Sequence, residues 1–242
     1  MDNAFNRTKL LIGEEALLKL QKSKVIVFGI GGVGGFTAEA LVRSGIGNIT
    51  LVDNDKIEES NLNRQIIATK DSLGKEKTQV ALQRLLSINP KANVTAINTF
   101  YLPQNAEEID FSEFDYVIDA VDTVTAKLEI IKRAKAQNVP VISCMGTGGK
   151  TDITRLKVDL VSKTSGCPLA KVMRKELKSL GIIDVKVVYS DEERVERKDS
   201  PSLEDCVKQS GRPAPGSMIF VPAAAGLMLA KEVVFDIINK KV

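Results

Sequence analysis

Short runs of hydrophobic residues alternate with amphipathic stretches over the first 150 residues of the chain. The runs are either continuous or alternate between apolar and polar positions, and continuous runs are typical of parallel strands covered on both faces. Helical periodicity lies between the runs, and the alternation predicts an α/β, Rossmann-like fold with helices on both faces of a mostly parallel sheet. The runs are KVIVFGI (24–30), NITLVD (48–53), NVTAIN (93–98), DYVIDAV (115–121) and VPVISCM (139–145), and the helical patterns are 33–45, 74–88, 124–138 and, more weakly, 104–109.

The pattern changes after residue 150. A helical spacing over 168–181 ends at Gly181, a residue type that favours the turn after a helix, and VKVVYS (185–190) predicts a further strand. A charged stretch poor in hydrophobic residues follows, so we expect a mobile surface loop near 190–215. The last apolar segment, at about 222–239, predicts a helix that packs on the sheet. Residues 151–242 should therefore complete the same domain as residues 1–150, as a basic C-terminal extension.

Composition narrows the class of protein. The chain has 242 residues, of which 43% are hydrophobic, and a net charge of +3, which fits one large α/β domain and does not by itself indicate a nucleic-acid binder. The longest apolar stretch, 218–230, contains Pro222 and is too short to cross a bilayer. The N-terminus lacks the order of a signal peptide. We therefore expect a cytoplasmic protein that does not contact the membrane.

Cysteine and histidine usage exclude several chemistries. The three cysteines, Cys144, Cys167 and Cys206, are widely spaced and form no CxxC pair, which disfavours disulfide frameworks and four-thiolate zinc sites. The chain has no histidine, so neither Ser-His nor Cys-His catalysis can be built from it. Acid–base chemistry must use Asp, Glu, Lys or the substrate itself.

The first motif that indicates a ligand is GIGGVG, residues 29–34, directly after a predicted strand and at the start of a predicted helix. Glycines in this position allow a tight turn and let backbone N–H groups approach a phosphate. Asp53, at the end of the next strand, is where a ribose hydroxyl would bind. Gly29, Gly31, Gly32, Gly34 and Asp53 thus predict a nucleotide site. Alone, they equally suit a nicotinamide dehydrogenase.

The second motif, DNDKIEESNLNRQ (53–65), carries acids, amides and Arg64 at the tip of one strand. A triphosphate needs cations here, because its β and γ oxygens must be neutralised when the α-phosphorus is attacked. Lys77, one turn inside the next helix, could reach the same place, and Asp122 in DAVDT could hold the accompanying Mg²⁺. Two alternatives stay open: Lys77 as a solvated helix charge, and Asp122 as a helix N-cap.

The motifs GIGGVGG, DNDKIEESNLNRQ, GKEKTQVALQRLLSINP and VIDAVDT together resemble the ubiquitin-activating-enzyme-like adenylating superfamily over about residues 5 to 150. The resemblance implies an adenylation core in residues 1–150 that uses ATP and Mg²⁺ and forms a homodimer. It implies that Arg64 and Lys77 bind the β- and γ-phosphates and that Asp122 binds the metal. The nucleotide site would also include Asp53, Asp55 and Asn61. Arg7 would reach across the dimer, or else belong to a mobile tail.

Two kinds of member remain as candidates. The segments after residue 150, including PLAKVMRKELKSLGI and FVPAAAGL, resemble the dehydratases that act on threonylcarbamoyladenosine in tRNA. That likeness implies ATP-dependent cyclisation through a carboxyl adenylate, with tRNA as partner and a sulfur-relay protein as a further candidate partner. The alternative is an adenylyltransferase that activates the C-terminus of a ubiquitin-like sulfur carrier, although such enzymes carry CxxC pairs. A scaffold that binds ATP without turnover is the alternative that is not an enzyme.

Two features of the C-terminal part bear on the substrate. Residues 150–178 hold eight Lys or Arg and three acidic residues, and this basic run either binds tRNA phosphates or is a solvated surface. Where the dehydratases are expected to have DPLA, this chain has CPLA. Cys167 at a helix start could be an activated nucleophile, or a small residue tolerated beside Pro168.

Overall fold

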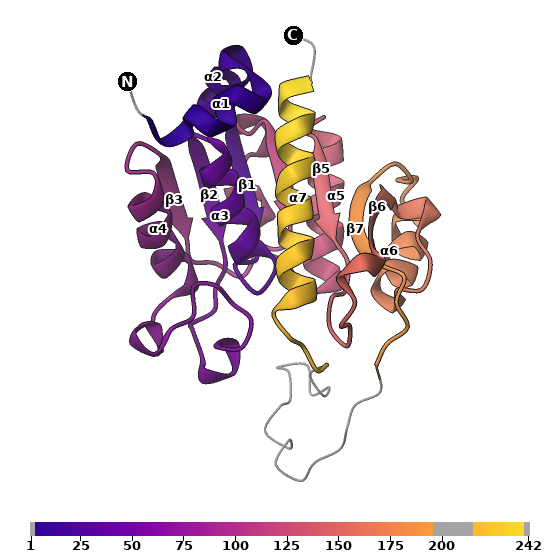
Figure 1. The fold of residues 1–242 in the computed structure, drawn as a ribbon. Coiled ribbons are helices and arrows are strands. Elements are labelled where there is room, and N and C mark those ends of the chain that lie inside the picture. Colours follow the sequence, from indigo (N-terminus) through magenta and orange to yellow (C-terminus); the bar gives the residue numbers. More distant parts are fainter. Residues whose placement is uncertain (1–2, 196–214, 240–242) are drawn as a thin grey trace.

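The computed structural model describes residues 3–195 and 215–239. Within them the chain forms one seven-stranded sheet in the order β3-β2-β1-β4-β5-β7-β6 (Figure 1). All neighbouring strands are parallel except β6 and β7. The strands are β1 (Lys24–Phe28), β2 (Asn48–Val52), β3 (Asn93–Ile97), β4 (Tyr116–Asp119), β5 (Val141–Cys144), β6 (Leu156–Leu160) and β7 (Lys186–Ser190).

Helices cover both faces of this sheet, which confirms the predicted fold class. One face carries α2, α3, α4 and α7, and the other carries α5 and α6 together with the segment 101–111. The helices are α1 (Asn6–Ile12), α2 (Glu14–Lys22), α3 (Gly34–Ser44), α4 (Lys77–Ile88), α5 (Val124–Ala136), α6 (Pro168–Ser179) and α7 (Phe220–Asn239). Short 3₁₀ turns connect several of them.

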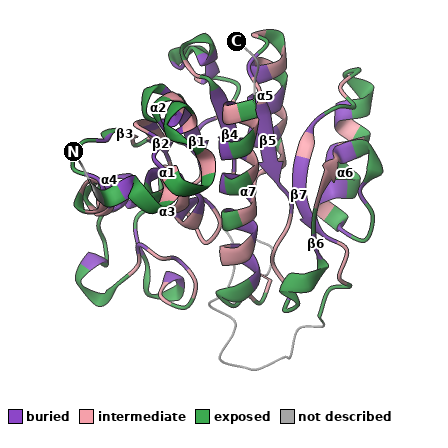
Figure 2. Cartoon of the chain, turned by 45° about the horizontal axis from the view of Figure 1, so that its top comes forward, coloured by how far each residue is buried: buried purple, intermediate pink, exposed green. Residues whose placement is uncertain are grey.

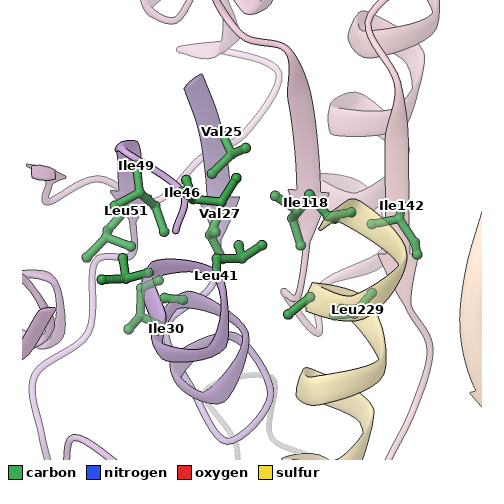
Figure 3. Packing of buried hydrophobic residues seen from close by; sticks show 14 of the residues in the cluster. Val25, Val27, Ile30, Leu41, Ile46, Ile49, Leu51, Ile118, Ile142 and Leu229 are labelled. Atoms are coloured by element: carbon green, nitrogen blue, oxygen red, sulfur yellow. The ribbon is translucent and has the colours of Figure 1, made fainter. Parts of the chain in front are cut away.

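The residues of β1 show why both faces must be covered. Val25 and Val27 point to the face of α3 and α7, whereas Ile26 and Phe28 point to the face of α5, and all four are fully buried. Adjacent side chains of a strand alternate between faces, so a strand buried on both sides is apolar at every position. Figure 3 shows the α3/α7 face, where Leu229 of α7 packs near Ile118 and Ile142.

Helix α7 lies against the start of α3. The hydroxyl of Thr37 donates to the carbonyl oxygen of Gly226 over 3.1 Å. A Cβ atom added to Gly226 would lie 2.5 Å from the carbonyl oxygen of Val33. Only glycine lets the two helices approach this closely. The last helix thereby supports the loop that precedes α3.

Several elements differ from the predictions. Helices α1 and α2 were not predicted, and neither was β6, which lies at the sheet edge and runs antiparallel to β7. The weak pattern at 104–109 corresponds to a 3₁₀ turn at Ala106–Glu108. Most of the predicted mobile loop near 190–215, with Cys206, lies outside the described residues. The division of the chain at residue 150 stays a prediction, although β6 and β7 belong to the same sheet as β1–β5.

Among the helices of the described part of the chain, none combines the length and the apolar character that crossing a bilayer requires. Helix α7 is the longest of them, but it carries Lys231, Glu232 and Asp236. It packs on the sheet and on α3 instead.

Candidate functional site

The predicted nucleotide residues gather at the carboxyl ends of β1, β2 and β4. The strand order reverses between β1 and β4, since the chain proceeds outward to β2 and β3 and then returns to β4. Crevices at such a switch point are where ligands bind in open α/β sheets. The glycine motif follows β1, Asp53 follows β2 and Asp122 follows β4. Figure 1 shows these loops at the end of the sheet opposite α1 and α2.

The glycine turn is packed on one side and open on the other. Gly29 has φ +85°, and a Cβ atom on it would lie 2.8 Å from the carbonyl oxygen of Ala120. A Cβ atom on Gly34 would collide with the carbonyl oxygen of Gly29 at 1.7 Å. Beside Gly31, in contrast, the nearest atom would be the side-chain Nε2 of Gln65 at 3.9 Å. The open side at Gly31 is therefore where a phosphate can approach the backbone.

Helix α3 points its N-terminus at this open side. The residue before it, Val33, has no side chain that caps the helix. The first N–H groups of an α-helix lack partners within the helix and carry partial positive charge. The glycine turn and α3 together form an anion site of the kind found in nucleotide-binding proteins.

Asp53 ties the end of β2 to the glycine turn. Its carboxylate accepts the N–H of Ile30 over 2.6 Å and the N–H of Asp55 over 2.8 Å. Burial raises the pKa of this carboxyl, and the nearby Lys77 counteracts part of that increase. A carboxylate has about four lone-pair positions, so two remain for a ribose hydroxyl.

Lys77 is a buried cation, not a solvated helix charge. Its side chain is 7% exposed, and Nζ lies 2.6 Å from Oδ2 of Asp55, whose side chain is half exposed. The backbone N–H of Lys77 donates to the carbonyl oxygen of Asp55 over 3.0 Å. The ammonium group is therefore fixed beside the strand end, on the same side as Asp53. The alternative interpretation of Lys77 is wrong for this structure.

Arg64 reaches the glycine turn from the next loop. Its Nη1 donates to the carbonyl oxygen of Ser60 over 2.8 Å and to Oδ1 of Asn63 over 2.9 Å. A Cβ atom on Gly32 would lie 3.4 Å from Cγ of Arg64. No carboxylate of the described chain forms an ion pair with this guanidinium, and burial lowers its pKa. An arginine stays charged in proteins, so this site has a positive charge without a counterion.

Asn61 holds the Arg64 loop in shape. Its side chain is 6% exposed, and its Oδ1 accepts the N–H of Glu58 over 3.2 Å. Its carbonyl oxygen accepts the N–H of Arg64 over 3.1 Å. These contacts make Asn61 a support for the loop, and any contact with phosphate remains a prediction.

Asp122 lies on the exposed rim between β4 and α5. The N-cap of α5 is Thr123, so the interpretation of Asp122 as the N-cap is wrong. Within residues 3–195 and 215–239 no three acidic, cysteine or histidine side chains come together as a metal cluster. One carboxylate is nevertheless enough for Mg²⁺, which is usually held by one or two carboxylates, substrate phosphates and water. The position of Asp122 therefore suits a metal that arrives with ATP.

A buried polar network that the sequence analysis missed supports the Asp122 loop. Nζ of Lys127 donates to Oδ2 of Asp119 over 3.0 Å and to the carbonyl oxygen of Cys144 over 2.6 Å. The hydroxyl of Ser143 donates to the same Asp119 oxygen over 2.5 Å, and Oδ1 of Asp119 accepts the N–H of Val121. Lys127 and Asp119 are both fully buried. The sequence signal that could have revealed this network is Lys127 itself, a lysine among the apolar residues of α5.

Arg7 is not part of the site of its own chain. It is exposed on α1, so it does not belong to an unstructured tail. Helix α2 leads directly into the start of β1, which places α1 and α2 at the amino end of the sheet (Figure 1). The nucleotide residues lie at the opposite end. A role for Arg7 at a nucleotide site would thus require a second copy of the chain.

The fold uses most of the basic run 150–178 internally. Five of its eight cations have polar partners in the structure: Lys150, Arg155, Lys157, Lys163 and Arg174. Among the described residues, Lys171, Lys175 and Lys178 have none, and all three are exposed on α6. Their spacing of i, i+4 and i+7 places them on one face of the helix.

The two cysteines of the described residues are poorly placed for nucleophilic chemistry. Cys144 is fully buried, and burial raises the pKa of its thiol to about 12. Cys167 is the N-cap residue of α6 and is 4% exposed. A Cβ atom on Gly146 would lie 3.9 Å from its Sγ. The thiol therefore packs against the β5 side of the fold, which favours the interpretation of Cys167 as a packing residue.

Comparison with known proteins is consistent with this geometry. A model of the ThiF family matches residues 5–241. The tRNA threonylcarbamoyladenosine dehydratase of Bacillus subtilis is 40% identical over 245 residues, which cover 99% of this chain and 96% of that protein. The crystal structure of the Escherichia coli tRNA N6-threonylcarbamoyladenosine dehydratase with AMP superimposes with a TM-score of 0.88 and 33% identity. The crystal structure of the same enzyme with ATP superimposes with a TM-score of 0.87 and 34% identity. Both superpositions cover 98% of this chain and 95% of the Escherichia coli chain.

Proposed function

The chain belongs to the ThiF family, and from this premise we propose that it is an ATP-dependent tRNA threonylcarbamoyladenosine dehydratase. The observation that carries the proposal is the charge of Arg64, which lies beside an open glycine turn and has no counterion among the described residues, with the buried Lys77 at the neighbouring strand end. This arrangement suits a triphosphate better than the diphosphate of a nicotinamide dinucleotide, because the added charge of the γ-phosphate requires cations.

The reaction balances in two steps. In the first, the threonyl carboxylate oxygen attacks the α-phosphorus of ATP, and the bond to the bridging oxygen of the β-phosphate breaks to release pyrophosphate. In the second, the carbamoyl nitrogen attacks the activated carbonyl carbon, loses its proton and displaces AMP. The net change in the nucleoside is the loss of one water. Because nucleophile and electrophile belong to the same substituent, proximity favours ring closure, and no histidine or covalent enzyme intermediate is required.

The residues of the chain have separate tasks in the first step. The glycine turn and the N-terminus of α3 bind phosphate oxygens, and Asp53 accepts a ribose hydroxyl. Arg64 and Lys77 neutralise the charge that accumulates on the departing pyrophosphate. Asp122 would hold Mg²⁺, which would supply further positive charge for that neutralisation.

The partner implied by the relatives is tRNA, and α6 provides a surface for it. Lys171, Lys175 and Lys178 are free to bind phosphates, whereas the other cations of the run are occupied within the fold. We also propose a homodimer in which Arg7 reaches the site of the partner copy. A sulfur-relay protein as a further partner stays a prediction.

The test is nucleoside mass analysis of threonylcarbamoylated tRNA after incubation with the protein, ATP and Mg²⁺. The wild type should produce a cyclic nucleoside lighter by one water. Arg64→Ala should lose at least about 100-fold of this activity, as expected for removal of a cation that stabilises the transition state. Arg43→Ala, a change at an exposed arginine of α3 that pairs with Glu39, serves as the matched control.

An unchanged tRNA mass with the wild type would contradict the proposal. In that case a carrier protein ending in Gly-Gly should be added, and pyrophosphate exchange with ATP measured. Exchange that depends on the carrier would instead identify an activator of a ubiquitin-like sulfur carrier.

A further inference from the structure

The side-chain oxygen of Gln65 is buried and has no hydrogen-bond partner in the described structure. The residue is 6% exposed, and its Oε1 is enclosed by protein. Its backbone, in contrast, is fixed: the N–H donates to the carbonyl oxygen of Asn61 and the carbonyl oxygen accepts the N–H of Ala68. Buried amides are nearly always hydrogen-bonded, because an unpaired one keeps the full cost of its desolvation.

Nothing within the fold explains why this position is an amide. An unbranched apolar residue of similar size, such as methionine, would occupy the same space without the cost of desolvation. The reason for a polar group must therefore lie on the side of the amide that reaches the surface. That side is Nε2. Unlike Oε1, it is not a buried atom that lacks a hydrogen-bond partner.

Nε2 of Gln65 borders the open space beside Gly31. Among the described residues other than the chain neighbours of Gly31, it is the one atom that would lie within 4 Å of a Cβ atom on that glycine, at 3.9 Å. Cγ of the preceding residue, Arg64, would lie 3.4 Å from a Cβ atom placed on the adjacent glycine, Gly32. The amide thus lies beside Arg64 at the place where a phosphate would approach the backbone.

We propose that Gln65 binds the ATP phosphates, with its side-chain NH₂ donating to phosphate oxygens between the glycine turn and Arg64. This inference rests on the ATP site of the proposed function and adds a residue to it. A phosphate oxygen accepts hydrogen bonds, so the donor end of the amide is the end that suits it. The amide carries no charge and therefore fixes the position of the phosphates, whereas Arg64 and Lys77 neutralise them.

Gln65→Met tests the proposal, with the affinity for ATP and the stability without ATP as separate readouts. The urea midpoint of the free protein should stay the same or increase, because an unpaired buried amide is removed. The dissociation constant for ATP, measured by titration calorimetry, should increase about 10-fold or more, as for the loss of a hydrogen bond to a charged group. Gln65→Glu, which brings a negative charge to the phosphates, should weaken ATP binding further.

Gln137→Met is the matched control. Gln137 also has a buried side-chain oxygen without a partner, but it follows α5 at the amino end of the sheet. The same substitution there should leave the affinity for ATP unchanged.

Wild-type ATP affinity in both Gln65 variants would overturn the assignment, and equal losses in Gln65→Met and Gln137→Met would overturn it as well. The proposed function fails by a different result. If the wild type binds ATP but leaves tRNA unchanged, the dehydratase proposal is wrong, and a weaker ATP affinity of Gln65→Met would still support the role of Gln65.

Discussion

Arg64 differs from the other cations near the carboxyl ends of the strands because it is partly buried and has no ionic partner among residues 3–195 and 215–239. Lys77 shares its charge with Asp55, whereas the guanidinium of Arg64 donates to neutral oxygens only. A desolvated charge without a counterion is unfavourable, and an anion that binds it removes the penalty. Tight binding of a polyanion to this site should therefore also raise the stability of the protein.

Also at the residue scale, replacement of two glycines of the turn by alanine should affect different properties, stability in one case and ATP binding in the other. Gly29→Ala should destabilise the free protein by at least about 1–2 kcal/mol, because φ is positive and a Cβ atom would overlap with Ala120. Gly31→Ala should leave that stability intact and weaken ATP binding, because its Cβ atom would enter the open space. Urea unfolding and ATP titration of both variants separate the two effects. Unchanged ATP affinity in Gly31→Ala would contradict the phosphate site.

The buried pair of Lys127 and Asp119 provides a second test at the residue scale. Lys127→Met alone should destabilise the protein by about 3–5 kcal/mol, because the Asp119 carboxylate would remain buried without its cation. Lys127→Met combined with Asp119→Asn should recover most of this loss, since no uncompensated charge remains. Urea unfolding measures both. A double variant as unstable as the single one would show that the fold depends on the charges themselves.

The positions of the candidate site residues were predictable from motifs of consecutive residues, whereas contacts between residues of distant strands were not. Asp53, Arg64, Lys77 and the glycines were located from motifs that follow predicted strands. The contacts of Lys127 were not, because its partners Asp119, Ser143 and Cys144 belong to two different strands. Sequence spacing gives no information on which strands become neighbours or which side chains meet between them.

At the scale of elements, α6 carries the remaining free cations of the basic run. Replacement of Lys171, Lys175 and Lys178 by glutamine should weaken tRNA binding and reduce the slope of log K against log salt by about 2–3, since each lysine that binds a phosphate releases roughly one counterion. The measurement is a filter-binding titration at several salt concentrations. ATP affinity should not change.

The control for α6 is a triple glutamine variant of Lys22, Lys24 and Lys91, exposed lysines at the amino end of the sheet. Its salt slope should equal that of the wild type. An equal decrease in both triple variants would mean that net charge, not α6, governs the association with tRNA.

The central elements were predictable because both their faces are buried. Strands β1, β2, β4 and β5 form largely buried hydrophobic runs, whereas β3 at the sheet edge is only partly buried. Helices α3, α4 and α5 lie within a few residues of their predicted bounds. Strand β6 alternates apolar residues with Lys157 and Asp159, as a half-buried edge strand does, but it is short and lies within the basic run 150–178, where charge dominates the pattern. Its antiparallel pairing with β7 depends on a contact across α6, which local pattern does not encode.

At the scale of the whole molecule, Arg7 lies at the opposite end of the sheet from the nucleotide site of its own chain. An assay of activity in mixed subunits can therefore test whether Arg7 acts in the site of a second copy. Arg7→Ala and Arg64→Ala should each be inactive alone, but mixed subunits should regain activity. In a random mixture half of the dimers are hybrids with one intact site, so about a quarter of the sites should work. The assay is the same nucleoside mass analysis. Hybrid dimers without activity would contradict a role of Arg7 in the partner's site.

Helix α1 also presents the surface through which copies could associate. Leu10 and Leu11 are 85% and 88% exposed, and Figure 2 shows α1 as mostly exposed, in contrast to the buried sheet. Leu10→Glu with Leu11→Glu should therefore shift the protein to a monomer in sizing chromatography. The same change should abolish the recovery of activity in mixed subunits.

The contact of Gly226 with Val33 and Thr37 also has a consequence for protein synthesis. Thr37 and Gly226 are 189 positions apart, and all seven strands precede α7 in the chain. A nascent chain on the ribosome thus exposes the apolar face beside α3 until α7 has been translated. A ribosome that stalls before Gly226 would leave a chain with every strand and the glycine motif but without the helix that supports them, a substrate for chaperones and proteases.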